Sequence, residues 1–222
     1  MSEEQDSEAA MTGATVYQRL RQEILSCRLR PGVQVRERQI ADRYGVSKSP
    51  VRDALIKLQE QNLVEVMPRK GYRVARISLA DARELYEMRM IYERESISRL
   101  VEFADDETLA GLDAFRKAPL DGPLDDWIAY NRRFHSYLAQ NCGNSRLARS
   151  AVEVIEQFDR LSFMSVSSGK ELGLEKRTAE HGVIIDAIQS SEKRRAITLL
   201  RDHLEISRRR LLDALESAPI VL

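Results

Sequence analysis

The chain of 222 residues contains three histidines, and their spacing could build one polar site inside a helical domain. His135, His181 and His203 each recur at helical spacing with apolar residues, so each imidazole is expected on the buried face of a different helix. Asn131 lies four residues before His135 and shares its face. Periodicity leaves two interpretations open, which are ordinary packed core histidines and a common binding site.

A second inward polar feature lies on the helix predicted over residues 79–103. Arg89 and Glu93 fall on or beside its apolar stripe, four residues apart. One interpretation is a helical ion pair at the edge of the stripe. The other is that Arg89 lines a cavity and binds a carboxylate, because a guanidinium matches that anion with two hydrogen bonds.

Cations and a hydroxyl gather at the start of a third helix, in the stretch from Gly45 to Gln59. Gly45 ends the preceding helix, Ser47 stands at an N-cap position, and Pro50 is tolerated in a first turn. Lys48, Ser49, Arg52 and Lys57 occupy the polar face, and Val51, Ala54, Leu55 and Leu58 form the apolar stripe behind it. This layout is typical of a DNA recognition helix.

The neighbouring segments favour a winged helix-turn-helix over a plain helical hairpin. Residues 37–44 predict a short amphipathic helix, which a turn separates from the recognition helix. Residues 63–74 form two β-branched runs around Pro68-Arg69-Lys70-Gly71, which predicts a hairpin with a basic tip.

Residues 14–76 resemble the winged helix-turn-helix of GntR-type bacterial transcription regulators. The similarity rests on Leu29-Arg30-Pro31-Gly32, the segment 38–44, the phrase VSKSPVRDAL and Arg69-Lys70-Gly71. It implies DNA contacts from Arg38, Lys48, Ser49, Pro50, Arg52, Lys70 and Gly71. Lys48 stands where many members have arginine, and an ammonium group lacks the bidentate geometry that suits guanine.

Residues 77–222 predict only helices, over about 79–103, 106–117, 123–141, 144–166, 174–190 and 192–216. Consecutive helices of these lengths make an all-α antiparallel bundle. The phrases ELYEMRMIYE, NRRFHSYLAQNCGN, EHGVIIDAI and RDHLE resemble the FCD effector-binding domain of the FadR branch. The expected organisation is a disordered tail over 1–12, the DNA-binding domain over 13–76 and the effector domain over 77–222.

This second resemblance implies a divalent metal bound by Asn131, His135, His181 and His203. Many FCD domains use an Asp-x-x-x-His pair and two later histidines, and here Asn131 replaces the carboxylate. A neutral amide oxygen is a weaker ligand, so the site should bind metal less tightly or carry more positive charge. Three imidazoles suit zinc or nickel and leave positions for water or a ligand.

Charge distribution and the absence of export signals agree with this reading. Residues 14–76 hold 14 Lys or Arg and 6 Asp or Glu, whereas residues 77–222 hold 21 and 25. A basic module beside a mildly acidic one is expected of a DNA-binding head on another domain. No signal peptide or membrane span is predicted, and Cys27 and Cys142 are expected as reduced thiols, so the expected location is the cytoplasm.

The sequence therefore predicts a homodimeric, metabolite-responsive transcription regulator, most simply a repressor, that binds operator DNA and is not an enzyme. The expected effector is a small carboxylate, since FCD ligands are typically organic acids. Two alternatives from other classes are a metal-dependent enzyme that uses the histidines to activate water and a DNA binder without a ligand. A metal sensor is a closer variant.

Overall fold

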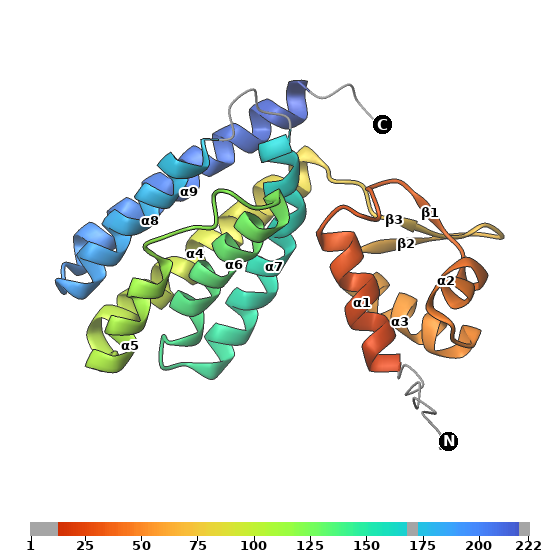
Figure 1. Cartoon of the computed structure of the whole chain (residues 1–222), viewed down its shortest axis with the longest axis horizontal. Coiled ribbons are helices and arrows are strands. Elements are labelled where there is room, and N and C mark those ends of the chain that lie inside the picture. The colour runs from red at the N-terminus through yellow and green to blue at the C-terminus, as the bar shows by residue number, and fades with distance from the viewer. Residues whose placement is uncertain (1–12, 168–172, 218–222) are drawn as a thin grey trace, which may run out of the picture. The chain divides into compact units, whose positions relative to one another are not determined.

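The computed structural model describes residues 13–167 and 173–217, and the predicted tail over residues 1–12 lies outside them. The chain divides into two compact units, Met1–Arg76 and Ile77–Leu222. Figure 1 shows the helices and strands of each unit. Among the described residues, no helix is both long and apolar enough to cross a bilayer.

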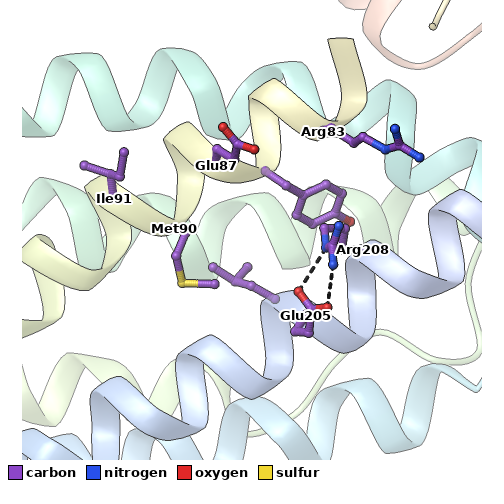
Figure 2. Close-up of a pocket in the computed structure, with 8 residues that line it drawn as sticks. Arg83, Glu87, Met90, Ile91, Glu205 and Arg208 are labelled. Carbon is purple, nitrogen blue, oxygen red and sulfur yellow. Dashed lines mark hydrogen bonds and ion pairs between the residues drawn. The ribbon is translucent and has the colours of Figure 1, made fainter. Parts of the chain in front are cut away.

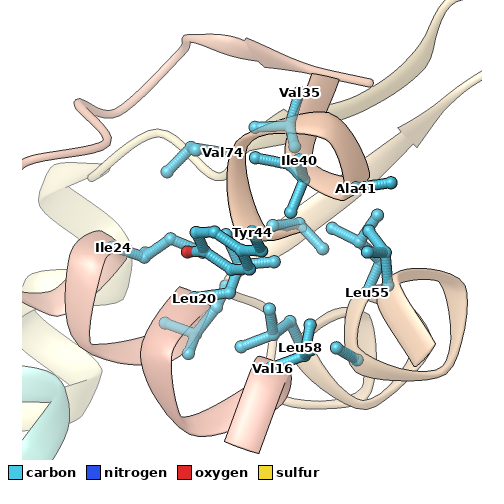
Figure 3. Close-up of a cluster of buried hydrophobic side chains, with 14 of the residues drawn as sticks. Val16, Leu20, Ile24, Val35, Ile40, Ala41, Tyr44, Leu55, Leu58 and Val74 are labelled. Atoms are coloured by element: carbon cyan, nitrogen blue, oxygen red, sulfur yellow. The ribbon is translucent and has the colours of Figure 1, made fainter. Parts of the chain in front are cut away.

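The first unit contains three helices around one apolar core. Its elements are α1 (Gly13–Leu25), β1 (Gln34–Val35), α2 (Glu37–Tyr44), α3 (Lys48–Glu60), β2 (Val64–Met67) and β3 (Gly71–Val74). Figure 3 shows side chains from all three helices and from strands β1 and β3 meeting in that core. Gly45 follows α2 with φ 68°, and this left-handed turn directs the chain into α3 as the sequence predicts.

The wing is a three-stranded antiparallel sheet with strand order β1-β3-β2. Strand β1 was not part of the predicted hairpin, because two residues are too short to show an alternating pattern. Gly71 has φ 92°, and a Cβ atom at this position would lie 2.9 Å from the Val35 carbonyl oxygen. The turn between β2 and β3 therefore requires glycine where the wing meets β1.

The second unit consists of helices within the described residues. They are α4 (Leu79–Phe103), α5 (Asp106–Gly111), the 3₁₀ helix η1 (Leu112–Phe115), α6 (Leu124–Gln140), α7 (Ser145–Ser167), α8 (Leu174–Gln189) and α9 (Lys193–Ser217). Helix α4 packs against α6, α7 and α9, while α6 packs on α7 and α8 on α9 (Figure 1). Tight turns make the last two pairs antiparallel.

Side-chain caps mark the start of three helices of the second unit. The Ser78 hydroxyl accepts a hydrogen bond from the Asp81 amide, Asp105 accepts one from Thr108, and the Asn144 side chain accepts from two amides. The helix predicted over 106–117 is wrong in detail, because the chain tightens into η1 at Leu112. The predicted fold class is confirmed, with a winged helix-turn-helix followed by a helical bundle.

Candidate DNA-binding surface and buried histidine centre

The N-terminal end of α3 presents polar side chains to solvent. Lys48, Ser49 and Arg52 are exposed and Pro50 is half-buried, while the apolar stripe behind them is buried in the core of the first unit. Backbone amides at a helix N-terminus lack partners within the helix and attract phosphate. The local geometry therefore leaves this end free to enter a DNA groove.

Arg52 is held in a defined orientation before any DNA arrives. Its guanidinium donates two hydrogen bonds to the Glu37 carboxylate, at 3.0 and 2.9 Å. The hydrogen bond from Arg52 lowers the pKa of Glu37, so the carboxylate stays ionised. Glu37 begins α2, and the contact fixes the recognition helix to the helix before it.

The other predicted DNA contacts are also accessible. Arg38 on α2 is exposed and makes only a 3.7 Å contact with Asp42 of the next turn. Lys70 at the tip of the wing is exposed, and its carbonyl oxygen accepts a hydrogen bond from Gln34. Surface cations on α2, α3 and the wing are suited to contact the DNA backbone.

The three histidines meet inside the second unit. His135 on α6, His181 on α8 and His203 on α9 are all buried, and their ring centroids lie 4.9 to 5.3 Å apart. One ring nitrogen from each lies within 4.8 Å of the other two. The inward orientation expected from periodicity is thus present, and three different helices contribute to one centre.

Hydrogen bonds at Nδ1 fix the state of all three rings. His135 Nδ1 lies 2.6 Å from Glu93 and His203 Nδ1 lies 2.8 Å from Glu180. His181 Nδ1 lies 3.1 Å from the Tyr130 hydroxyl, which itself donates to a backbone carbonyl and so accepts from the ring. In its neutral form each ring therefore carries its proton on Nδ1 and leaves a lone pair on Nε2.

Two of the three histidines end a chain of the form Arg–Glu–His. Arg89 pairs with Glu93, which holds His135, and Arg210 lies 3.5 Å from Glu180, which holds His203. Burial and then the charge of Arg89 lower the pKa of His135 to about 3. Burial and then the other two histidines lower the pKa of His181 well below its usual value. Neutral imidazoles at pH 7 are the form that binds metal.

This arrangement fits a divalent metal ion. Nε2 of His135 and Nε2 of His181 are buried and have no hydrogen-bond partner among the described residues. Such atoms are costly unless something binds them. Carboxylates at Nδ1 are the usual outer partners of metal-bound histidines, since they orient the ring and increase its basicity. Asn131 lies half-buried on α6, one turn before His135, and the structure gives no contact that tests it as a ligand.

Within the part of the chain that the structure describes, the centre has no evident general base. Glu93 and Glu180 are the carboxylates next to the imidazoles, and each is already bound by a histidine and an arginine. A carboxylate held in this way orients a ring and does not accept a proton from water. The geometry therefore favours binding over hydrolysis.

Arg89 forms the ion pair with Glu93 that one interpretation of the sequence expects, and its role in ligand binding stays a prediction. It pairs with Glu93 as the ion-pair reading expects, but the pair is buried rather than at the edge of a stripe, and Arg89 is only 2% exposed. Its guanidinium lies over the Phe158 ring at 4.5 Å, and its Nη2 has no hydrogen-bond partner among the described residues. Arg89 thus keeps one donor for a ligand.

An open groove elsewhere in the bundle does not include the predicted site residues. It runs between α4 and α9 and is lined by Arg83, Tyr86, Glu87, Met90, Ile91, Leu204, Glu205 and Arg208. Figure 2 shows the Glu205–Arg208 ion pair along one wall, with hydrogen bonds of 2.6 and 2.9 Å. None of the three histidines lines this groove, so the histidine centre is a separate feature.

Sequence reasoning missed the partners of the histidines. Glu93 and His135 are 42 residues apart, and Glu180 and His203 are 23 residues apart, so no local pattern joins them. Glu93 did show a signal, because it falls inside an apolar stripe. Glu180 gave no such signal. It directly precedes His181 in the sequence, but it pairs with His203 on another helix.

Two family matches cover most of the chain. Residues 12–74 match the bacterial regulatory proteins of the gntR family, and residues 84–206 match the FCD domain. The chain belongs to the GntR family of transcription regulators and carries an FCD domain. The predicted resemblance is confirmed, and the relatives are regulators rather than enzymes.

Named relatives include two repressors from Escherichia coli. The HTH-type transcriptional repressor RspR is 32% identical over 155 residues, which cover 68% of each chain. The HTH-type transcriptional repressor GlaR is 26% identical over 208 residues, covering 87% of this chain and 93% of GlaR. Among solved structures, E. coli McbR/YncC has a TM-score of 0.79 at 18% identity, covering 90% of this chain and 97% of that one, which supports the fold alone.

Proposed function

We propose that this GntR-family regulator is a repressor whose operator affinity is controlled by a small organic acid bound beside a divalent metal ion. The observation that carries the proposal is the set of buried imidazoles with Nδ1 bound to Glu93, Glu180 and Tyr130 and with Nε2 left without a proton. The two E. coli relatives RspR and GlaR are named as repressors, which supports repression.

Four side chains would hold the metal, which are Asn131, His135, His181 and His203. Zinc and nickel suit this set of ligands, because three imidazoles and one neutral oxygen form a borderline-soft site. The bound ion supplies positive charge that attracts a carboxylate. Arg89, with its unpartnered Nη2, would bind the same acid group.

Operator binding would use a homodimer. Arg38, Lys48, Ser49, Pro50, Arg52, Lys70 and Gly71 form one DNA-binding head, and one recognition helix covers only half of a useful operator. Two heads that bind paired half-sites raise the specificity for the operator. A protein that binds chromosomal DNA in a bacterium is located in the cytoplasm. An effector that binds more tightly to an arrangement of the heads that does not fit the operator would lower operator affinity. The loss of affinity would equal the effector's preference for that arrangement.

The test combines metal loading with a ligand screen. Zinc-loaded protein is heated with a panel of organic acids, and the acids that raise its melting temperature are added to an operator gel shift. A ligand at 100 times its Kd stabilises the folded state by about 2.7 kcal/mol, which gives a measurable shift. We expect at least one acid to raise the melting temperature and weaken DNA binding. Acids that do neither would contradict the proposal.

A further inference from the structure

Several buried donor atoms of the helical bundle have no hydrogen-bond partner among the residues that the structure describes. Among the described residues, Arg89 Nη2, Trp127 Nε1 and Arg177 Nε are buried and have no hydrogen-bond partner. Each of these groups can only donate a hydrogen bond. Their natural partner is therefore an acceptor, and two of the three groups are cations.

Arg177 and Trp127 lie together on neighbouring helices. Arg177 is on α8, one turn before His181, and Trp127 is on α6, two turns before His135. The Arg177 guanidinium lies 5.6 Å from the centre of the Trp127 ring. Both residues are on the buried faces that carry the histidines, displaced toward the N-terminal ends of their helices.

Among the described residues Arg177 makes no close ion pair, although the more distant Glu180 carboxylate acts to raise its pKa. Arg89 pairs with Glu93 and Arg210 contacts Glu180, but within residues 13–167 and 173–217 Arg177 has no ion pair. Arg177 is nevertheless buried, with a relative exposure of only 9%. Burial and then the neighbouring charge of Arg210 lower its pKa. A buried cation without a counter-ion is unfavourable unless a bound anion compensates it.

Tyr86 connects this cation to Arg89. Burial raises the pKa of the Tyr86 hydroxyl, while the charges of Arg89, Arg177 and Arg208 lower it. Tyr86 donates to or accepts from Ser207 at 2.9 Å, which fixes its hydroxyl between α4 and α9. Arg89 and Arg177 therefore both lie close enough to Tyr86 for their charges to act on its hydroxyl.

We propose that the effector carries two carboxylates, and that Arg177 and the Trp127 indole N–H bind the one farther from the metal. This rests on the proposed function, in which the metal and Arg89 bind the first acid group. One helical turn separates Arg177 from His181, a rise of roughly 6 Å. A dicarboxylate of about four to six carbons spans that rise.

The single tryptophan of the chain gives a direct readout, because Trp127 contacts Arg177. Zinc-loaded protein is titrated with succinate, glutarate and adipate, and with butyrate, valerate and hexanoate as monocarboxylates of equal length. Tryptophan fluorescence and the melting temperature are both recorded. We expect the best dicarboxylate to bind about tenfold or more tightly than its matched monocarboxylate, since a charge-assisted pair is gained.

Substitution at Arg177 should remove this preference without unfolding the protein. Arg177→Gln loses the cation, and because that cation has no carboxylate partner, its melting temperature without ligand should be equal or higher. Arg177→Lys should retain part of the preference, since it keeps the charge and loses the planar fork. Arg133→Gln, at an exposed position on α6, is the matched control and should behave as the wild type.

The outcomes separate this inference from the proposed function. If monocarboxylates bind as tightly as dicarboxylates, or if Arg177→Gln keeps the dicarboxylate preference, the role of Arg177 is wrong and the metal-linked effector site stands. If none of the six acids changes the fluorescence or the melting temperature, the inference is overturned. If the wider organic-acid panel also gives no melting shift and no loss of DNA binding, the proposed function fails with it.

Discussion

At the scale of single residues, the inward histidines could be predicted and their partners could not. Helical periodicity depends only on residues within a few turns, so it places His135, His181 and His203 on buried faces. The carboxylates at Nδ1 of His135 and His203, and the tyrosine hydroxyl at Nδ1 of His181, come from other helices. Only the fold brings Glu93 and Glu180 to these rings. Because the carboxylates occupy Nδ1, the fold also shows that Nε2 is the nitrogen left for a metal.

The proposed DNA contacts of Arg52 and Arg38 predict that each side chain contributes to operator affinity. Replacing either by alanine should weaken operator binding about tenfold to hundredfold, because a lost base contact has roughly that effect. Circular dichroism should be unchanged, since both side chains are exposed. Arg28→Ala removes another exposed arginine of the same unit and serves as control. Equal gel-shift affinity of all four proteins at matched salt would show that α2 and α3 do not bind the operator.

Asn131→Asp tests the proposed role of Asn131 as a fourth metal ligand. A carboxylate in place of the amide should tighten zinc binding, because an anionic oxygen is a stronger ligand for a divalent cation. Competition against a chelator measures the change, and Asn141→Asp at the end of α6 is the control. If both variants bind zinc with the wild-type affinity, Asn131 does not contact the metal.

At the scale of elements, strong local signals were predicted well and weak ones were missed. Gly45 ends α2 in a left-handed turn as expected, because the preference of glycine for that backbone conformation is a local property. The break at Leu112 and the strand Gln34–Val35 were not predicted. Both depend on packing against distant parts of the chain, which outweighs local propensity.

A substitution in the wing should change the affinity for DNA without changing the preference for sequence. Lys70→Ala should weaken binding to all sequences alike and flatten the slope of log affinity against log salt by about one unit, as loss of a phosphate contact does. The side chain is exposed, so the fold should be unaffected. A change in preference among operators would instead make Lys70 a base contact.

The first helix of the bundle predicts a stability change. Ser78→Ala removes the hydrogen bond to the Asp81 amide, which is 2.9 Å long, and should lower the free energy of unfolding by about 1 kcal/mol. Urea unfolding followed by circular dichroism measures it. Thr198→Ala, exposed within α9, is the control and should cause no loss. A similar loss in both variants would argue against the cap.

At the scale of the whole molecule, the basic and the mildly acidic parts of the sequence fall in two different compact units. The first unit has its own apolar core, so its DNA-binding surface does not need the metal centre to fold. His135→Ala combined with His203→Ala should therefore keep operator binding and lose the response to the effector. A gel shift with and without the effector measures both, and loss of DNA binding in a folded variant would contradict this independence.

The metal content of the purified protein tests the central claim most directly. Wild-type protein and the His135→Ala/His203→Ala variant are loaded with zinc or nickel, desalted and analysed for metal. We predict about one ion per chain in the wild type and none in the variant, since two of three imidazoles are gone. Wild-type protein that retains neither metal would contradict the account, and the three residues would then be ordinary core histidines.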